Sequence, residues 1–336
     1  MPEPCVIEQT TYCGLRVVLL ENDLLRVVIA PEAGGRVWQI VYKPKAANLL
    51  WNNPGVPLSR PVPGSPYDDV WSGGWDELFP NDEEAKINDQ DYPDHGELWS
   101  GNWDYAPFSA DGEAGVRLSF LTPISGFEVE KSITISRQGQ IRFQYRFTNN
   151  GPCPFPFLWK LHPAFSVTAA HRVDFPQMQV VLEPRFPGTL GHAPLQFAWP
   201  YARTGDREID LRTVPPAARR ELYFFYGTQM ASGWCAVTDT SNQVSCGLRF
   251  DPKVFSSCWL FASYGGWRDY NVAVLEPCTG YPLNFDAMRE SGRHRTLAPG
   301  ETLSTDVLFA VQAGIGSVGH MDEEGKMVEE PAATLG

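Results

Sequence analysis

Three short segments of the 336-residue chain carry side chains that could bind a ligand and exchange protons with it. In the first, residues 93–99, His95 is followed by Gly96. A glycine beside a histidine leaves the imidazole accessible and lets a ligand approach the backbone closely. The competing interpretation is a loop histidine whose ring is hydrogen-bonded to Asp94, and so short a motif is compatible with both.

The second segment, residues 155–165, is aromatic and apolar except for Lys160 and His162. Side chains of a strand alternate between its two faces, so Lys160 and His162 share one face. A face with these two residues either meets solvent or lines a polar cavity. The aromatic residues on both sides favour a covered strand, and the sequence leaves both interpretations open.

The third segment, residues 271–282, places Glu276 at the end of a continuous apolar strand. A carboxylate there is costly unless it has a partner. Pro277 interrupts the strand and Gly280 turns the chain away, so the carboxylate is well placed to face a cleft. The alternative is a salt bridge at the rim of the fold, for example to Arg268.

Tryptophans are concentrated in the sequence around His95. Pyranose rings present CH-rich faces, and the flat indole ring with its polar N–H is a suitable partner for them. Core packing explains most tryptophans in most proteins, but several in one irregular segment are less easily explained in this way. The residues concerned are Trp71, Trp75, Trp99 and Trp103.

The elements that must position these residues are strands almost throughout. Short β-branched or apolar runs alternate with turns, and 30 glycines and 29 prolines are spread along the chain. Proline inside a helix costs about 3 kcal/mol, so this density excludes a helical bundle. Residues 137–139 are expected to form a hairpin turn. We expect strands at residues 15–20, 24–30, 36–42, 116–121, 127–136, 140–148, 157–167, 178–183, 222–226, 235–238, 245–250, 259–262, 272–276 and 302–311.

The sequence has no internal repeat and no linker, which predicts one large antiparallel β domain over residues 1–316. Residues 52–94 lack any sustained periodicity, yet their aromatic content predicts an ordered segment, and a long ordered loop is usually functional. From residue 317 to 336 the chain is polar and acidic, with too few apolar groups to fold, so we expect a disordered tail.

Composition narrows the partners and the compartment. Acids outnumber bases 40 to 27, and a formal charge of −13 disfavours nucleic acid and anionic membranes as partners. No apolar run approaches the roughly 20 residues that cross a bilayer, and no secretory signal precedes the strands, so a cytoplasmic protein is expected. The seven cysteines are scattered without a CxxC pair, which favours reduced thiols over disulfides or a zinc site.

Motifs for cofactor chemistry are missing from the sequence. The paired glycines do not form GxGxxG or GxxxxGK[ST], and neither HExxH nor GxSxG occurs. No metal and no cofactor are therefore expected.

Taken together, these segments resemble the aldose 1-epimerase (galactose mutarotase-like) family. The matching motifs occur in the family's order, and the resemblance extends from roughly residue 15 to residue 312. They are the N-terminal strand pair at residues 22–37, the Gly…Phe-Pro loop at 73–81, the histidine motifs at 95–96 and 162–165, the glutamate segment at 275–282 and the turn at 297–303.

The resemblance implies an all-β fold, a large antiparallel β-sandwich (a supersandwich) with a carbohydrate cleft. It also implies an enzyme that interconverts the α and β anomers of a sugar by opening and reclosing the ring. In that assignment Glu276 is the general base, His162 is the general acid and His95 binds the substrate at the catalytic centre.

The sugar itself is only partly defined. Ser72 and Trp99 occupy positions where hexose-6-phosphate members of the family are expected to carry arginines, which points to an unphosphorylated sugar. Substrate contacts are expected from five residues, of which Lys160 and Arg268 could still meet an acidic group. The five are Trp75, Asp76, Trp99, Lys160 and Arg268.

Two other functions remain open from the sequence. The first is a non-catalytic carbohydrate-binding or regulatory protein on the same fold, because fold does not fix function. The second is another carbohydrate-active enzyme, a lyase or a glycosidase, in which Asp76 or Glu77 would supply the second carboxylate that glycosidases use. The oligomeric state is not indicated by the sequence.

Overall fold

The structure, a computed structural model, describes residues 5–110, 112–136 and 139–330. The chain forms two compact units: unit 1 comprises Met1–Ala164 and Glu276–Val307, and unit 2 comprises Phe165–Leu275 and Leu308–Gly336. The chain passes between them inside three strands, so no polar linker marks the boundaries. This explains why the sequence indicated one domain. The three strands are β14 (Lys160–Ser166), β24 (Asn271–Cys278) and β26 (Thr302–Ala313).

The first sheet of unit 1 is antiparallel, in the order β1-β2-β3-β4-β6-β14. Strands β2, β3 and β4 match the expected runs closely, whereas β1 and β6 were not expected. Asn22 forms one of the expected turns by accepting hydrogen bonds from the backbone N–H groups of Leu24 and Leu25. The strands are β1 (Val6–Tyr12), β2 (Leu15–Glu21), β3 (Leu25–Ala30), β4 (Arg36–Tyr42) and β6 (Trp75–Leu78), with β5 (Ala47–Asn48) beside β4.

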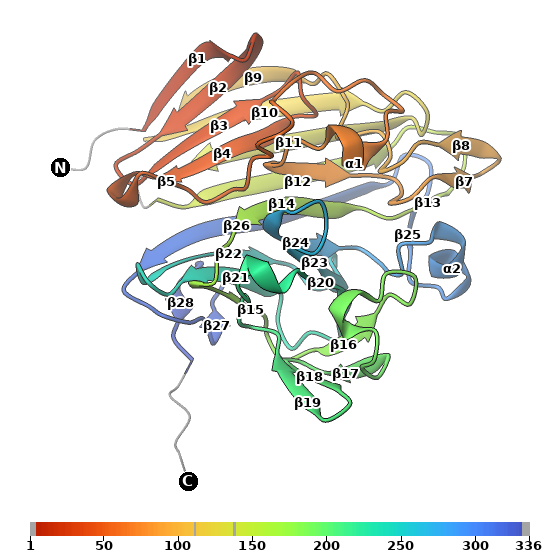
Figure 1. The fold of residues 1–336 in the computed structure, drawn as a ribbon. Coiled ribbons are helices and arrows are strands. Elements are labelled where there is room, and N and C mark those ends of the chain that lie inside the picture. Colours follow the sequence, from red (N-terminus) through yellow and green to blue (C-terminus); the bar gives the residue numbers. More distant parts are fainter. Residues whose placement is uncertain (1–4, 111, 137–138, 331–336) are drawn as a thin grey trace. The chain divides into compact units, whose positions relative to one another are not determined.

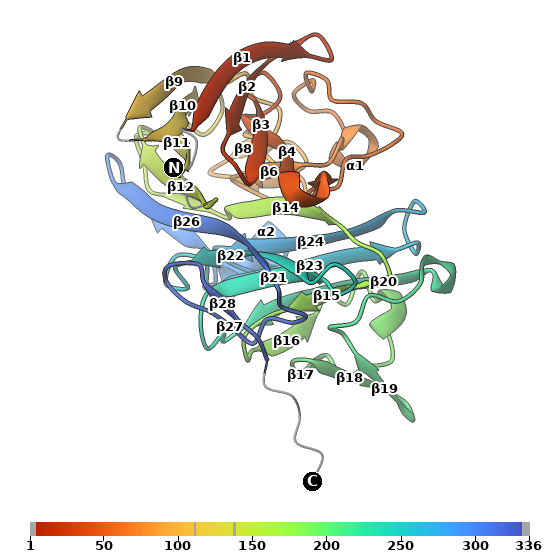
Figure 2. The same ribbon diagram turned by 90° about the vertical axis from the view of Figure 1, so that its left-hand side faces the viewer.

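The second sheet of unit 1 contains β12-β11-β10-β9 in that order, and Figure 1 and Figure 2 show the two sheets as facing layers. Side chains alternate between buried and accessible along β11 and β12, as the sequence predicts. The ring of Phe143 packs on that of Trp75 with centroids 4.2 Å apart and joins the sheets. The strands are β9 (Asp104–Ala110), β10 (Glu113–Leu121), β11 (Phe127–Ile135) and β12 (Ile141–Asn149).

Small elements complete unit 1. Residues 52–94 are ordered, as predicted, and hold the short helix α1 (Tyr67–Val70), whose Tyr67 is buried. The run expected at residues 157–167 is broken into β13 and β14 by Leu158 and Trp159. Of the hairpin turn expected at residues 137–139, two residues lie outside the described chain. The remaining elements are η1 (Lys43–Lys45), β7 (Ala85–Ile87), β8 (Gln90–Tyr92), β13 (Phe155–Phe157), α2 (Phe285–Glu290) and β25 (Arg295–Leu297).

Unit 2 is also built from antiparallel strands. One set has the order β23-β20-β16-β17, another has β15-β21-β22, and β18 and β19 form a separate hairpin. The elements are β15 (His171–Asp174), β16 (Gln179–Leu182), η2 (Gly188–Leu190), β17 (Gln196–Ala198), β18 (Tyr201–Thr204), β19 (Arg207–Asp210), η3 (Ala217–Arg219), β20 (Glu221–Thr228), β21 (Trp234–Asp239), β22 (Val244–Phe250) and β23 (Ser257–Tyr264).

The C-terminal segment differs from the expected disordered tail. Residues 317–330 contain a small hairpin of β27 (His320–Met321) and β28 (Met327–Val328), and both methionines are buried in one apolar cluster with Trp234. Residues 331–336 lie outside the described chain. The apolar residues here are too widely spaced to give a periodic signal, which is why the sequence suggested disorder.

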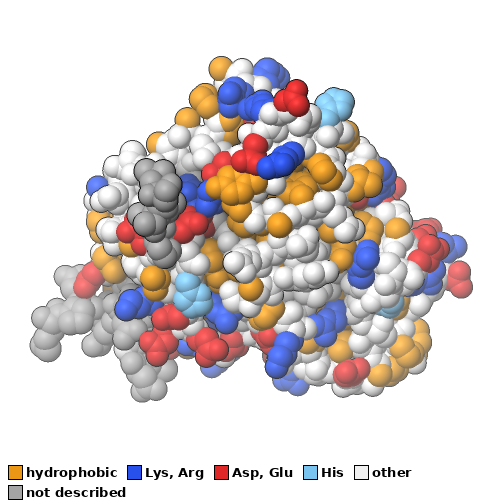
Figure 3. All heavy atoms as spheres, turned by 90° about the horizontal axis from the view of Figure 1, so that it is seen from below, with side chains coloured by type: hydrophobic (Ala, Val, Ile, Leu, Met, Phe, Trp, Pro, Cys, Tyr) orange, Lys and Arg blue, Asp and Glu red, His pale blue; other side chains and the backbone are white. Residues whose placement is uncertain are grey.

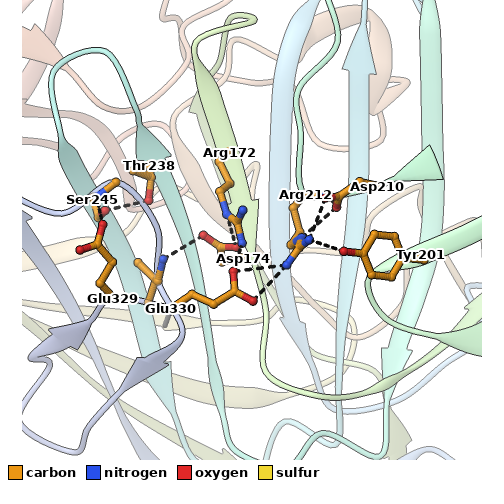
Figure 4. A network of polar contacts seen from close by, with 11 residues as sticks. Arg172, Asp174, Tyr201, Asp210, Arg212, Thr238, Ser245, Glu329 and Glu330 are labelled. Atoms are coloured by element: carbon orange, nitrogen blue, oxygen red, sulfur yellow. Dashed lines mark hydrogen bonds and ion pairs between the residues drawn. The ribbon is translucent and has the colours of Figure 1, made fainter. Parts of the chain in front are cut away.

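Ion pairs also hold this segment to the rest of unit 2. Figure 4 shows Glu330 between two arginines, Arg172 and Arg212, and Arg212 also contacts Asp210 and the hydroxyl of Tyr201. The Arg212 Nη1 lies 3.0 Å from Glu330 Oε1. The segment is thus fixed by both apolar and ionic contacts.

Surface and thiol properties agree with the composition. On the face drawn in Figure 3, acidic and basic side chains of the described residues are interspersed. All seven cysteines lie in the described part of the chain, where none of them forms a disulfide, and four of them are buried. In the part of the chain that the structure describes, no helix is both long enough and apolar enough to cross a membrane.

Candidate active site

Strands β6 and β14 set out the first group of site residues in unit 1. In their antiparallel register, Lys160 is opposite Leu78 and His162 is opposite Asp76. Residues directly opposite one another have side chains on the same face, with Cβ atoms about 5 Å apart. Lys160 and His162 are both buried, with relative exposures of 3% and 6%. The strand is therefore covered, and the solvent-facing interpretation was wrong.

The Nδ1 atom of His162 is held from one side of the ring. It lies 3.1 Å from the hydroxyl of Tyr67 and 3.3 Å from Asp76 Oδ1, and the tyrosine hydroxyl donates to Asp76 Oδ2 at 3.0 Å. With a carboxylate as its acceptor, Nδ1 carries the hydrogen. Nε2 is then the nitrogen that can exchange a proton with a ligand.

Asp76 lies behind the histidine and is fully buried. Its Oδ2 accepts a hydrogen bond from Arg36 Nη2 at 2.8 Å. Burial works against ionisation, but the guanidinium of Arg36 and then His162 outweigh it and lower the pKa of Asp76 to about 2. Asp76 was predicted to contact the sugar. Its burial and its partners instead make it a residue that orients His162.

His95 approaches the same tyrosine from the other side. The imidazole of His95 stacks on the ring of Tyr67, with centroids 4.0 Å apart and planes inclined by 8°. Its own backbone has a φ of 61°, and a Cβ added at Gly96 would meet the carbonyl oxygen of Phe79 at 2.0 Å. The glycine is thus required for close backbone packing, and this packing presents His95 to Tyr67.

Two carboxylates contact the ring of His95. Nδ1 donates to Asp94 Oδ1 at 2.7 Å, which is the contact that the competing interpretation of the motif proposed, and Nε2 lies 3.9 Å from Asp82 Oδ1. Burial alone would lower the pKa of His95. The hydrogen bond to Asp94 and the charge of Asp82 outweigh it, so the pKa of His95 is raised.

Glu276 is buried at the end of β24 and forms an ion pair with Lys160. The Lys160 Nζ lies 2.7 Å from Glu276 Oε2 and 2.5 Å from Asp82 Oδ1, so one ammonium joins two carboxylates. Burial of Lys160 favours its neutral form, but Asp82 and then Glu276 outweigh this and raise its pKa. The same ammonium, together with His95, lowers the pKa of Asp82 against the effect of burial.

Backbone contacts fix this end of β24 beside the start of β14. The N–H of Thr279 donates to the carbonyl of Trp159 at 2.9 Å, and the N–H of Trp159 donates to the hydroxyl of Thr279 at 2.8 Å. Lys160, which contacts Glu276, therefore lies two residues before His162 on the same face of β14. Alternate residues of a strand are about 7 Å apart, so the residue that meets Glu276 is one such step from His162.

The tryptophans of this region are buried rather than accessible to a ligand. Trp75 packs between the sheets, and Trp99 meets the ring of Tyr67 edge-on at 5.0 Å. Trp71 lies edge-on to His162 at 5.3 Å. Trp75 and Trp99 were predicted to contact the sugar; both are at most 1% exposed, and that role stays a prediction.

Glu77, the neighbour of Asp76, points to the opposite face of β6. It accepts from Lys131 Nζ at 2.6 Å and from the Tyr145 hydroxyl at 2.8 Å, and burial raises its pKa. Glu77 therefore belongs to a second buried cluster between the sheets of unit 1. The chain places only one of these two adjacent carboxylates with the histidines.

Arg268 belongs to unit 2. It is exposed, and its guanidinium lies over the ring of Trp267 at 4.9 Å. The salt bridge that the sequence suggested for Glu276 is made by Lys160 instead. The predicted role of Arg268 in substrate binding stays a prediction.

An open hollow of about 410 Å³ lies beside His95. Its lining includes Asp94, one oxygen of which contacts His95 while the other accepts from the backbone N–H of Tyr67 at 3.0 Å. Three of its five lining residues are acidic. They are Gly64, Pro66, Glu83, Glu84 and Asp94. Among the described residues, no group of His, Cys, Asp and Glu side chains is arranged to hold a metal ion.

Sequence reasoning missed three residues of this site. Tyr67 lies in the irregular segment 52–94, where no strand or helix periodicity predicts which way a side chain points. Asp82 directly follows the Phe-Pro-Asn motif that ends at Asn81, and Arg36 had been noted only as part of a strand pair. A search for the partners of each buried charge would have suggested Asp82 and Arg36.

Comparison with known proteins identifies the fold. No protein-family model and no curated protein matches the chain, whereas solved structures match it over most of its length. A "putative aldose 1-epimerase" from Klebsiella pneumoniae subsp. pneumoniae has a TM-score of 0.69 at 15% identity, covering 91% of this chain and 83% of that one. The fold is galactose mutarotase-like.

Further solved structures share this galactose mutarotase-like fold. A galactose mutarotase-like protein from Clostridium acetobutylicum has a TM-score of 0.66 at 13% identity, with 93% of this chain and 99% of that chain covered. A "putative aldose 1-epimerase" from Escherichia coli K12 has a TM-score of 0.61 at 15% identity, with 92% and 99% covered. The expected large antiparallel β-sandwich is confirmed.

Proposed function

We propose that this protein is an aldose 1-epimerase that interconverts the α and β anomers of an unphosphorylated sugar. The observation that carries the proposal is the series of direct contacts that links His95, His162 and Glu276 within unit 1. Tyr67 contacts both histidines, and Lys160 and Asp82 connect Glu276 to His95. The names of the structural neighbours agree with this activity.

In the proposed reaction, Glu276 removes the proton from the C1 hydroxyl while His162 donates a proton from Nε2 to the ring oxygen. The bond between C1 and the ring oxygen breaks, and C1 becomes a carbonyl. Rotation about C1–C2 presents the other carbonyl face, and the ring closes with the two proton transfers reversed. Each positioned acid or base contributes about 10²–10⁴-fold, and no metal or cofactor is needed.

The roles of the supporting residues follow from their contacts. Asp76 and Tyr67 keep the hydrogen on Nδ1 of His162, so that Nε2 alternates between donor and acceptor. His95, held by Asp94 and with a raised pKa, offers a hydrogen-bond donor to the sugar hydroxyls. Asp76 supports the site without touching the sugar.

One observation favours the second candidate, a carbohydrate-binding protein without catalysis. Glu276 is ion-paired with Lys160 at 2.7 Å, so its carboxylate is already engaged by a partner inside the protein. The retention of a histidine oriented through Nδ1 favours the enzyme.

A glycosidase is less well supported. Asp76 and Glu77 were the possible second carboxylates. Asp76 is engaged by Arg36 and His162, and Glu77 by Lys131 and Tyr145. Oligosaccharide digestion would separate this function, because released reducing ends require cleavage.

The decisive test is exchange NMR or polarimetry on a panel of neutral aldoses. We expect accelerated anomer exchange for at least one sugar and a loss of about 10²–10⁴-fold in Glu276→Gln. Glu77→Gln is the matched control, because it removes a buried carboxylate of the same unit outside the site. If no aldose is accelerated while one binds, the carbohydrate-binding function replaces the enzyme.

A further inference from the structure

The most unusual feature of the site is a lysine buried between two carboxylates. The side chain of Lys160 is 4% exposed, and those of Asp82 and Glu276 are 9% and 1% exposed. Taking a lysine out of water is costly unless close partners compensate for its charge. Here the compensating charges are those of Glu276, the predicted general base, and of Asp82, the carboxylate that faces His95.

Unit 1 offers a direct comparison in its other buried lysine, Lys131. Its ammonium contacts one carboxylate, that of Glu77, together with the carbonyl of Gly35, and it lies 5.2 Å from the ring of Trp103. That arrangement joins the two sheets and touches no histidine. Lys160 is similarly buried, but its ammonium joins Asp82 and Glu276, two residues of the site.

We propose that Lys160 is the positioning residue of this site: its ammonium holds the Glu276 carboxylate in place at the strand face that carries His162, and through Asp82 it links that carboxylate to His95. This inference rests on the proposed function. It assigns Lys160 a role inside the protein rather than the expected role of binding an acidic group on the sugar.

The charge arrangement gives this role its physical basis. An opposite charge within about 4–6 Å favours the ionised form of a carboxylate by one to three pKa units. Asp82 and Glu276 are both buried and contact the same ammonium, so without it two like charges would face each other out of water. The ammonium between them compensates for that repulsion. The titratable groups that interact with Lys160 include Glu276 and Cys278 of β24, Asp82 after β6, and Asp94 and His95 of the loop before β9, and His162 shares its strand face.

The pH profile distinguishes positioning from mere structural support. Without the ammonium, the two buried carboxylates face each other with no cation between them, so the acidic limb of the kcat/KM profile moves to higher pH. In Lys160→Met we expect an upward shift of about one to three pH units, and Lys160→Arg, which keeps the charge, returns the limb toward the wild-type position. Lys131→Met is the control: it loses a buried ion pair but leaves the limb unchanged.

A second variant covers the case in which Lys160→Met fails to fold. Lys160→Met combined with Asp82→Asn removes the cation and one anion together, so no pair of like charges stays buried without compensation. The limb of this double variant should still move upward, by less than in the single variant. An unshifted limb in the folded variants overturns the proposal.

Carboxyl ¹³C NMR titration makes the test independent of turnover. The Asp82 signal is assigned by its absence in Asp82→Asn, and its midpoint, which Lys160 lowers in wild type, is compared between wild type and Lys160→Met. If wild type does not accelerate anomer exchange but this midpoint still rises in the variant, the proposed function fails while the role of Lys160 stands. If the midpoint does not move, the role of Lys160 is rejected whatever the activity.

Discussion

His162 lies directly opposite Asp76 in the antiparallel pair of β14 and β6, and its Nδ1 is 3.3 Å from the carboxylate. This cross-strand relationship is fixed by backbone hydrogen bonds, so the ring orientation does not depend on a mobile loop. The other oxygen of Asp76 is held by Arg36. A histidine supported in this way is prepared for proton transfer before a ligand arrives.

Replacing Asp76 should therefore impair turnover more than binding. In Asp76→Asn, the amide cannot hold the hydrogen on Nδ1 as the carboxylate does, and we expect kcat to fall by about 10²–10⁴-fold with a smaller change in KM. Steady-state polarimetry measures both constants, and a circular-dichroism melt reports folding. A folded variant with unchanged kcat would contradict this role.

Asp76 should also make the stability of the fold depend on pH in the acidic range. Its folded pKa of about 2 lies below the usual 3.8, so the stabilisation is fully present above pH 3.8 and is lost as the pH falls towards 2.

The Tyr67 hydroxyl should contribute separately from the tyrosine ring. Tyr67→Phe removes the donor to Asp76 and the contact with Nδ1, but it keeps the stacking on His95. A hydrogen bond to a charged group is worth about 1.5–3 kcal/mol, so we expect kcat to fall by roughly 10–100-fold with KM little changed. Tyr92→Phe, which alters a buried tyrosine of the same unit outside the site, should leave kcat unchanged.

Much of the fold could be predicted from the sequence because strands have a local signal. Alternation along β11 and β12 and the turn formed by Asn22 depend on near neighbours in the chain. The C-terminal hairpin was missed because burial of Met321 and Met327 is decided by a distant partner, Trp234. The boundaries between the units were missed because they fall inside strands.

The three residues singled out as reactive lie in one series of contacts, but the residues that support them could not be predicted from the sequence. His95, His162 and Glu276 stood out because each is polar within an apolar or glycine-containing context. Asp82 and Tyr67 lie in irregular segments, where the spacing of residues in the sequence does not predict which way their side chains point. Asp76 was singled out, but its buried partner Arg36 lies 40 residues earlier and could not be predicted from the sequence.

His95 should titrate above the usual pKa of about 6.5, because Asp94 and Asp82 stabilise its cation more than burial opposes it. The resulting stabilisation is fully present below pH 6.5 and is lost as the pH rises through the folded pKa. Histidine NMR titration measures this directly, and Asp94→Asn should lower the midpoint.

His171 of unit 2 provides an internal control in the same spectra. Burial lowers its pKa, so it should titrate below 6.5. If His95 titrated at or below the midpoint of His171, the assigned balance of charges around His95 would be wrong.

Anionic sugars should be poorer substrates than their neutral parents. The ammonium of Lys160 already faces two carboxylates, and the hollow beside His95 is lined by Glu83, Glu84 and Asp94. Like charges brought together at about 4 Å cost on the order of 1–4 kcal/mol, depending on exposure to solvent. We therefore expect kcat/KM for a uronic acid or a sugar phosphate to be at least about 10-fold below that of the neutral aldose.

Neutralising one carboxylate of the hollow tests the cause of this preference. Glu84→Gln should narrow the difference between anionic and neutral sugars, and added salt should narrow it further because exposed charges are screened. Glu128→Gln, on the accessible face of β11, is the matched control and should change neither rate. If an anionic sugar turned over faster than its neutral parent, a cation would have to contact its acidic group. That result would support the predicted role of Arg268 in substrate binding.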